Sequence, residues 1–185
     1  INDDYVMSLY DPGKDRLWMG LWDGGIELLN RKTNMIRHFQ SVGAVNLTAY
    51  PNVAFVERTE NGRQKLYIGT RGNGLLKCSF DDFDNTLQLD RQYRFGAGQA
   101  GCLSNDKINA LFRDSRERIW VCTSGGLNLL EAGGNTFRVF RQADGLPSDI
   151  IQSIQEDNNG VIWISTQNGI ASLSPDNNGR MNVQV

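Results

Sequence analysis

Leu17-Trp18-Met19-Gly20 is the first copy of the short phrase that decides the fold of this chain. Three later copies follow at steps of 49, 53 and 43 residues between the aromatic positions: Leu66-Tyr67-Ile68-Gly69, Ile119-Trp120-Val121-Cys122 and Ile162-Trp163-Ile164-Ser165. Self-similarity with a period of about 40–50 residues is typical of propellers and other repeat arrays. The sequence therefore predicts four repeats, approximately at residues 5–40, 52–95, 107–141 and 150–185.

Each repeat is built from short runs of β-branched, aromatic and aliphatic residues, bounded by residues that form turns. The chain has 20 Gly and only 4 Pro, which suits a succession of tight turns. No segment repeats its apolar residues at helical spacing over three turns, so no helix is expected. We expect antiparallel four-stranded meanders. The expected strands include 5–10, 16–21, 26–29, 35–39, a strand near 87–95, 108–112, 119–123, 127–130, 137–140, 151–155, 161–166, 170–173 and 181–185.

The second strand of each repeat places a large ring and a small residue on the same face. Trp18 and Gly20 share a face because side chains alternate along a strand, and the other repeats follow the same rule. A ring beside a small residue lets neighbouring sheets interlock. A β-sandwich also has aromatic residues in its core, but four in-register copies favour radial repetition. The predicted structural core is Trp18, Gly20, Tyr67, Gly69, Trp120, Cys122, Trp163 and Ser165.

Composition argues against several classes of partner. The net charge is −2, from 19 basic and 21 acidic residues, and no basic stripe indicates nucleic-acid binding. No run of ~18 apolar residues is present, so this segment itself is not expected to contact a membrane. Cys78, Cys102 and Cys122 are too few for a closed disulfide set, and their spacing to one another and to His38 is not that of a metal site. No metal and no cofactor are expected.

Few residues suggest catalysis. The chain has one histidine, and no Ser/His/Asp constellation or glycine-rich phosphate loop is evident, so this fragment is not expected to be an enzyme. His38 is expected to be a partly buried structural residue. Asp11, Asp114 and Asp157 are interpreted as turn formers, since they lack the spacing of a calcium loop. Paired carboxylates contributed by different repeats, as glycosidases use, stay open as an alternative.

The fourth repeat resembles the two-component regulator propeller repeat. That pattern reads G-L-P-S-N, a strand, D-x-x-G, then L-W-I-G-T and x-x-G-L. The matching segments are Gly145-Leu146-Pro147-Ser148-Asp149, Asp157-Asn158-Asn159-Gly160, Ile162-Trp163-Ile164-Ser165-Thr166 and Gly169-Ile170. The third repeat matches with Leu103-Ser104-Asn105-Asp106 and residues 118–127, with Cys122 in place of Gly. The first two repeats match more loosely.

The resemblance implies an all-β protein, a β-propeller segment of four blades, each a four-stranded antiparallel meander. Propellers of this family usually have about seven blades, so the chain is expected to be a fragment of a larger wheel. The implied function is that of a non-catalytic sensor in the periplasmic part of a histidine kinase or hybrid two-component system of the Bacteroidetes type, detecting an oligosaccharide. The alternatives are a protein-interaction scaffold and, third, a carbohydrate-cleaving propeller enzyme.

A ligand is expected at one end of the sheets. In a meander, the turns between second and third strands share an end with the crossings between repeats. Sugar recognition uses flat rings, planar amides and Arg for acidic groups. These residue types also form ordinary hairpin turns, and packing of Trp22 between blades is an equally open alternative. The candidate ligand-binding residues are Trp22, Asp23, Arg71, Asn73, Gln167 and Asn168.

The terminal repeats raise the question of self-association. Propellers protect their sheet edges and faces by closing a ring. Four blades of a wider wheel would leave apolar faces exposed on the first and last sheets. We therefore expect the chain to dimerise through these faces, to swap strands, or to rearrange into a tighter closed ring.

Overall fold

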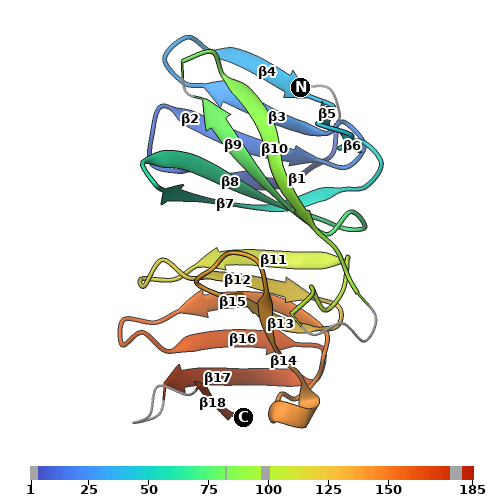
Figure 1. The fold of residues 1–185 in the computed structure, drawn as a ribbon, viewed down its shortest axis with the longest axis vertical. Helices are drawn as coiled ribbons and strands as arrows, with labels where there is room; N and C mark the ends of the chain where they lie inside the picture. Colours follow the sequence, from blue (N-terminus) through green and yellow to red (C-terminus); the bar gives the residue numbers. More distant parts are fainter. Residues whose placement is uncertain (1–3, 82, 97–100, 176–180) are drawn as a thin grey trace. The chain divides into compact units, whose positions relative to one another are not determined.

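The computed structural model describes residues 4–81, 83–96, 101–175 and 181–185, and strands dominate it (Figure 1). Four of its sheets have four antiparallel strands each, connected as meanders. We call them blades 1 to 4 in chain order, and they confirm the predicted all-β architecture of four four-stranded blades. The chain divides into two compact units, Ile1–Tyr93 and Arg94–Val185. Unit 1 holds blades 1 and 2, unit 2 holds blades 3 and 4, and each unit is described by itself.

The strand bounds lie within one or two residues of most of the predicted ones. Blade 1 contains β1 (Val6–Tyr10), β2 (Arg16–Leu21), β3 (Ile26–Asn30) and β4 (Met35–Phe39). Blade 2 contains β7 (Asn52–Glu60), β8 (Arg63–Thr70), β9 (Leu75–Asp81) and β10 (Thr86–Tyr93). Blade 3 contains β11 (Ile108–Arg113), β12 (Ile119–Thr123), β13 (Gly126–Leu130) and β14 (Phe137–Phe140). Blade 4 contains β15 (Ile151–Glu156), β16 (Ile162–Thr166), β17 (Gly169–Pro175) and β18 (Met181–Gln184).

Two short elements lie outside the predicted pattern. The crossing from blade 1 to blade 2 contains a hairpin of β5 (Ser41–Val42) and β6 (Val45–Asn46), whose two valines are buried in the core of unit 1. The crossing from blade 3 to blade 4 contains a 3-10 turn at Gln142–Asp144, ended by Gly145 at a φ of 101°. Among the residues that the structure describes, this turn is the one departure from the expectation of no helix.

In each unit the blades stack through the rings of the second strands. Trp18 lies 6.4 Å from Phe55 and 5.1 Å from Phe80, measured between ring centroids, and both of those rings belong to blade 2. Trp120 belongs to one apolar cluster with Ile162 and Ile164 of blade 4. The first strand of the second blade packs against the first two strands of the preceding blade, as β7 does on β1 and β2, and β15 on β11 and β12. The first strands therefore adjoin one another within each unit.

The predicted repeat positions are buried in three blades and exposed in the fourth. Trp18, Tyr67, Trp120 and Cys122 have no exposed surface, and Gly20 and Gly69 are buried beside them. Trp163 differs, because 44% of it is exposed and Ser165 is half-buried. In the residues that the structure describes, no further sheet of unit 2 covers this face of blade 4.

The polar edge of each ring is bound by a carboxylate. Trp120 donates from Nε1 to Asp114 Oδ2 at 2.8 Å, and Trp163 donates to Asp157 Oδ2 at 3.0 Å. The other oxygen of each aspartate accepts backbone N–H groups of its turn, as expected of turn formers. Trp18 instead donates to Glu57 of blade 2 at 2.9 Å. These bonds satisfy the ring N–H, which is costly to bury unpaired.

Blade 2 replaces tryptophan with Tyr67, whose hydroxyl donates to Glu60 at 2.5 Å. Lys77 and Arg58 form ion pairs with the same carboxylate. Burial disfavours the charged form of Glu60, but hydrogen bonds from Lys77, Tyr67 and Arg58 outweigh it and lower its pKa to about 2. Burial, together with the bond to Glu60, raises the pKa of Tyr67.

The lowered pKa predicts how Glu60 contributes to stability as pH changes. Its stabilisation is fully present above the ordinary pKa of 4.5 and disappears as pH falls towards 2. We expect Glu60→Gln to lower the melting temperature at pH 7, and the gap from the unsubstituted chain to close between pH 4.5 and pH 2. Thermal unfolding of both proteins across this range measures the gap. A gap that stays constant with pH would contradict the assignment.

Candidate ligand-binding surface

All four blades hold the turn after the second strand in the same way. The backbone N–H of the first turn residue donates to the carbonyl of the residue that precedes the first strand. The bonds are Trp22 to Tyr5 at 3.0 Å, Arg71 to Pro51 at 3.0 Å, Ser124 to Lys107 at 3.1 Å and Gln167 to Ile150 at 3.0 Å. Each first strand has a register shift directly after its first residue. Bulges of this kind re-aim side chains beside binding sites.

Asn52 joins the two blades of unit 1 at this end. Its side chain is buried and donates from Nδ2 to Gly25 O at 3.1 Å and to Leu47 O at 2.8 Å. Gly25 ends the β2–β3 turn, and Leu47 lies in the crossing that leads to β7. The turn that carries Trp22 and Asp23 is therefore fixed to the crossing and to the start of blade 2.

Asn73 fixes the equivalent turn of blade 2. Its Nδ2 donates to Asn46 O of the crossing at 3.1 Å, and its backbone carbonyl accepts a bond from Gln92 at 2.9 Å. The sequence suggested Asn73 as an amide for a ligand. In the structure this amide holds the β8–β9 turn against β6, so Asn73 has a structural role in fixing the turn.

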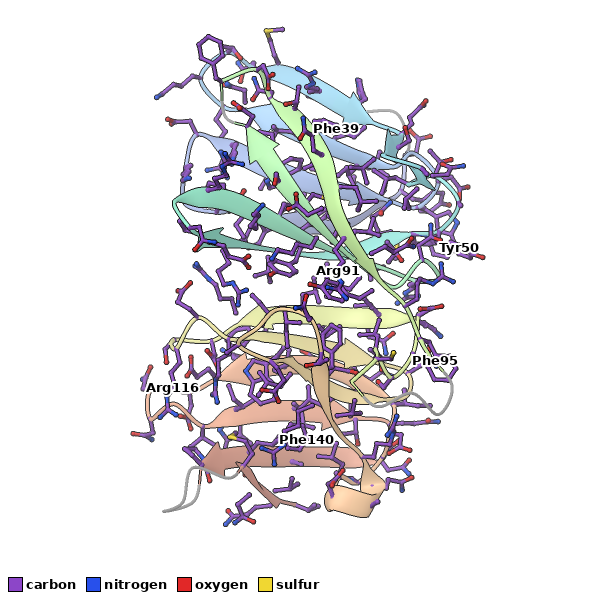
Figure 2. All side chains as sticks on the ribbon, in the orientation of Figure 1. Phe39, Tyr50, Arg91, Phe95, Arg116 and Phe140 are labelled. Atoms are coloured by element: carbon purple, nitrogen blue, oxygen red, sulfur yellow. The ribbon has the colours of Figure 1, made fainter. Side chains whose placement is uncertain are left out.

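Tyr50 covers the same turn and was missed by the sequence analysis. A Cβ atom added to Gly72 would lie 2.4 Å from a ring carbon of Tyr50, so the ring rests directly on the glycine. Figure 2 shows Tyr50 at the end of unit 1 where β5 and β6 lie. The only sequence signal was an aromatic residue in a crossing, directly before Pro51.

The β2–β3 turn, the β8–β9 turn and the crossing between them form one surface at this end of unit 1. We call it the turn-end surface and define it as Tyr5, Trp22, Asp23, Tyr50 and Arg71. The three rings are large and exposed, and 44% of Trp22 and 44% of Tyr50 are accessible. Asp23 and Arg71 are also exposed and lie on the turns beside these rings. Exposed rings with a nearby carboxylate and guanidinium suit a ligand with flat apolar faces and polar edges, such as a sugar.

Two of the predicted ligand residues belong to unit 2. Gln167 and Asn168 are exposed on the β16–β17 turn, where the Asn168 N–H donates to Thr166 Oγ1 at 3.1 Å. On the β12–β13 turn, Ser124 precedes Gly125, whose carbonyl accepts a bond from Arg141. These turns carry neither a ring nor a cation of their own. The turn-end surface of unit 1 is therefore the better candidate.

The position of Tyr50 gives a direct prediction. In Gly72→Ala, the new methyl group displaces the Tyr50 ring while the blade stays folded, since an exposed ring moves at little cost. We expect a loss of less than about 1 kcal/mol in the free energy of unfolding. NMR measures the ring-current shifts of the turn protons, which should disappear in this variant and in Tyr50→Ala. Gly133→Ala, which meets open space, is the control. Unchanged shifts in Gly72→Ala would contradict the contact.

Other polar groups serve the fold. His38 Nδ1 lies 2.7 Å from the buried Glu27 carboxylate, on adjacent strands β4 and β3. Burial raises the pKa of the Cys78 thiol to about 12, and it also raises the pKa of Cys122, so both thiols stay protonated. Within the described residues, no three His, Cys, Asp or Glu side chains are grouped to hold a metal ion. No helix found in that part of the chain is long and apolar enough to cross a membrane.

A hollow lies at the opposite end of blade 2. It has a volume of 490 Å³, and Arg63, Gln64, Asp81 and Gln88 are among its lining residues. Arg63 and Gln64 begin β8, Asp81 ends β9 and Gln88 lies near the start of β10, at the end of the blade away from the Trp22 turn. Its lining holds a single ring, that of Phe80, which is buried against Trp18.

A protein-family model described as the two component regulator propeller matches residues 102–125 and 145–168. Both segments lie in unit 2, and the second includes the β16 strand that carries Trp163. Histidine kinase P4 of Formosa agariphila is 31% identical over 117 residues, which are 63% of this chain and 8% of that protein.

Solved structures share the fold. The extracellular domain of BT3049 from B. thetaiotaomicron, described as a hybrid two component system, matches with a TM-score of 0.72 and 23% identity. The match covers 95% of this chain and 26% of that one. Virginiamycin B lyase from Staphylococcus aureus matches with a TM-score of 0.67 and 13% identity, over 97% of this chain and 55% of the lyase. At these identities the likeness concerns the propeller fold alone.

Proposed function

We propose that this chain, whose residues 102–125 and 145–168 are two-component regulator propeller repeats, is a ligand-sensing segment of a two-component receptor. The similarity to a histidine kinase and to the extracellular domain of BT3049 supports this reading. The chain spans about a quarter of that domain and less than a tenth of that kinase. The kinase activity and the location outside the cytoplasm are accordingly proposals about a longer protein.

The ligand that we propose is an oligosaccharide bound on the turn-end surface. The observation that carries the proposal is that the large rings of Trp22 and Tyr50 are both exposed on this surface. Asn52 binds the end of the Trp22 turn and the crossing that carries Tyr50, at Gly25 O and Leu47 O, and Asn73 binds the Arg71 turn to Asn46 O of that crossing. Little ordering is therefore needed when a ligand arrives. Asp23 and Arg71 supply charged hydrogen-bonding groups at the edge of the rings.

Signalling would follow from differential affinity. A ligand changes a receptor only as far as it binds one arrangement more tightly than another. The turn-end surface joins two blades through the β2–β3 turn and the crossing, so a ligand lying across Trp22 and Tyr50 would favour one arrangement of these elements. A catalytic group is not required for this function.

The test is a binding screen with the full chain. Calorimetry with oligosaccharide pools from digested polysaccharides should give saturable binding without product. Trp22→Ala and Tyr50→Ala should each weaken binding by about 1–2 kcal/mol, roughly five- to thirtyfold. Phe83→Ala is the matched control, because Phe83 is an exposed ring in the same unit, away from the turn-end surface.

Each other outcome argues against the proposal in a different way. Turnover of a saccharide would replace the sensor with a carbohydrate-cleaving enzyme. Silence across all pools would exclude oligosaccharides as ligands of this segment and favour a protein-interaction scaffold. Binding that Trp22→Ala and Tyr50→Ala leave unchanged would place the site elsewhere in the chain.

A further inference from the structure

Arg71 is the one charged residue in the part of the turn-end surface around Tyr50. Residues 40–56, which include the crossing, carry no charged side chain, and the β8–β9 turn carries only Arg71. The Arg71 backbone N–H donates to Pro51 O at 3.0 Å, directly after Tyr50 in the chain. The next residue, Gly72, lies under the Tyr50 ring. The cation and the exposed ring therefore start from adjoining stretches of backbone.

The β8–β9 turn around Arg71 is held by bonds within the protein. Thr70 Oγ1 donates to Gly74 O at 2.9 Å and accepts a bond from the Asn73 N–H at 2.8 Å. The Asn73 amide donates to Asn46 O at 3.1 Å. Among the described residues, the exposed Arg71 side chain has no hydrogen bond, ion pair or ring contact. The backbone of the turn is thus fixed, while its cation stays available to a ligand.

Most arginines of unit 1 are engaged within the fold, and Arg71 is an exception. Five of the seven have a partner: Arg16 with Glu57, Arg31 with Asp11, Arg37 with Asp84 O, Arg58 with Glu60 and Arg91 with the Tyr93 ring. Within the described part of the unit, Arg63 and Arg71 have none. Arg63 lines the hollow at the opposite end of blade 2, together with Asp81 and Asp84. Two carboxylates beside Arg63 disfavour an anionic ligand there, so Arg71 is the better position for one.

The two ends of the turn-end surface differ in charge. Asp23 follows Trp22 on the β2–β3 turn, whereas Arg71 adjoins Tyr50. An anionic group next to Trp22 would meet the Asp23 carboxylate, and like charges repel. An anionic group next to Tyr50 would instead meet the Arg71 guanidinium, whose planar fork can donate two parallel hydrogen bonds to it. The charges therefore set the direction of a ligand that lies across the two rings.

We propose that the ligand of the turn-end surface is an acidic oligosaccharide, whose carboxylate or sulfate group is bound by Arg71 beside Tyr50. An uncharged sugar unit of the same ligand lies on Trp22. This proposal rests on the proposed oligosaccharide-sensing function and adds the charge and the direction of the ligand. Uronic acids supply a carboxylate and sulfated sugars supply a sulfate ester, and the oxygens of both accept hydrogen bonds from a guanidinium.

A separation of the oligosaccharide pools by charge tests the proposal. Digests of pectin supply carboxylates, digests of carrageenan supply sulfate esters, and digests of mannan are neutral. An anion exchanger divides each digest into a retained and an unretained fraction. Calorimetry with the full chain should show binding of the retained pectin or carrageenan fraction, and the digest that binds identifies the acidic group. The unretained fractions should bind more than about tenfold more weakly.

Variants of two exposed arginines locate the acidic group. Arg71→Gln should weaken binding of the retained fraction by about tenfold or more. Its melting temperature should stay unchanged, because the side chain has no partner among the described residues. Arg71→Lys keeps the charge without the planar fork and should recover part of the affinity. Arg63→Gln is the matched control, since it removes an exposed arginine away from the turn-end surface, and it should leave binding unchanged.

The outcomes separate this proposal from the sensing function on which it rests. Binding confined to the unretained fractions and weakened by Trp22→Ala would overturn the acidic ligand, while the oligosaccharide-sensing function would stand. Silence in every fraction would overturn both. Binding of a retained fraction that Arg71→Gln leaves unchanged would show that Arg71 does not bind the acidic group, and it would overturn the proposal as well.

Discussion

Replacing Glu57 with alanine is expected to lower the free energy of unfolding by about 3–5 kcal/mol. Glu57 lies on β7 of blade 2 and accepts bonds from Arg16 at 2.8–3.1 Å and from Trp18 Nε1 at 2.9 Å, both on blade 1. All three side chains are buried. The substitution would therefore leave the Arg16 charge without its carboxylate partner and the Trp18 N–H without its acceptor, in a place that water does not reach.

Chemical denaturation of the full chain measures this loss. The double variant Arg16→Met with Glu57→Leu should recover the part of the loss that the unpaired Arg16 charge causes, because replacing both partners of a buried pair with apolar residues is often neutral. The Trp18 N–H stays without its acceptor in this variant, so the recovery is incomplete. Asp11→Ala is the matched control, since it breaks the exposed Arg31–Asp11 pair and should leave the free energy of unfolding nearly unchanged. If Glu57→Ala and Asp11→Ala were equally mild, the buried network would not be what joins blades 1 and 2.

Gly20→Ala is expected to cost about 3 kcal/mol, at the upper end for overpacking of a core. A Cβ atom at Gly20 would lie 2.0 Å from Asn52 O and 2.5 Å from Ser8 Oγ. The nearer atom is backbone, so blades 1 and 2 would have to separate. Because the Asn52 side chain also holds the Trp22 turn, the variant should bind ligand more weakly than its stability alone explains.

The same repeat position in blade 3 provides the comparison. Cys122 occupies it with a side chain, so Cys122→Ala should cost less than about 1.5 kcal/mol. Gly133→Ala, which meets open space in the same unit as Cys122, should be near neutral. Thermal and chemical unfolding of the three variants gives the ranking. A Gly20→Ala variant as stable as Gly133→Ala would show that the blades of unit 1 do not approach as closely as described.

The repeated phrase was enough to predict the blades, because a ring and a small residue on one face have a use only between stacked sheets. The hairpin of β5 and β6 was missed because Val42-Gly43-Ala44-Val45 is unique to the first crossing, so no period reveals it. The sequence analysis expected an exposed apolar face on the last sheet but did not assign Trp163 to it. A sequence shows that a ring belongs to the repeat, but not whether another sheet covers it.

For the candidate site too, the repeat pattern predicted which turns the residues lie on, but not the contacts made outside the repeats. Alternation along the meander placed Trp22 and Arg71 on turns of one kind, and the shared backbone bonds hold these turns at one end of unit 1. Tyr50 lies in a crossing of irregular length, so periodicity could not predict its contact with Gly72. Asn73 has the chemistry of a ligand-binding amide, but its local geometry directs it to Asn46 O.

The turn aspartates also bind the ring N–H of a tryptophan, and this second role could have been predicted from the sequence. Asp114 precedes Trp120 by six residues, and Asp157 precedes Trp163 by the same distance. The sequence analysis treated these residues as turn formers only. Their other oxygen binds the ring N–H, which could have been inferred from the constant spacing and from the need of a buried indole for an acceptor.

The most direct test is a crystal structure of the full chain with an oligosaccharide that the binding screen identifies. A pyranose ring stacked on Trp22 or Tyr50, with Asp23 or Arg71 in hydrogen-bonding reach, is the result that we expect. A sugar in the hollow beside Arg63 and Asp81, or on the Gln167 turn of unit 2, would contradict it.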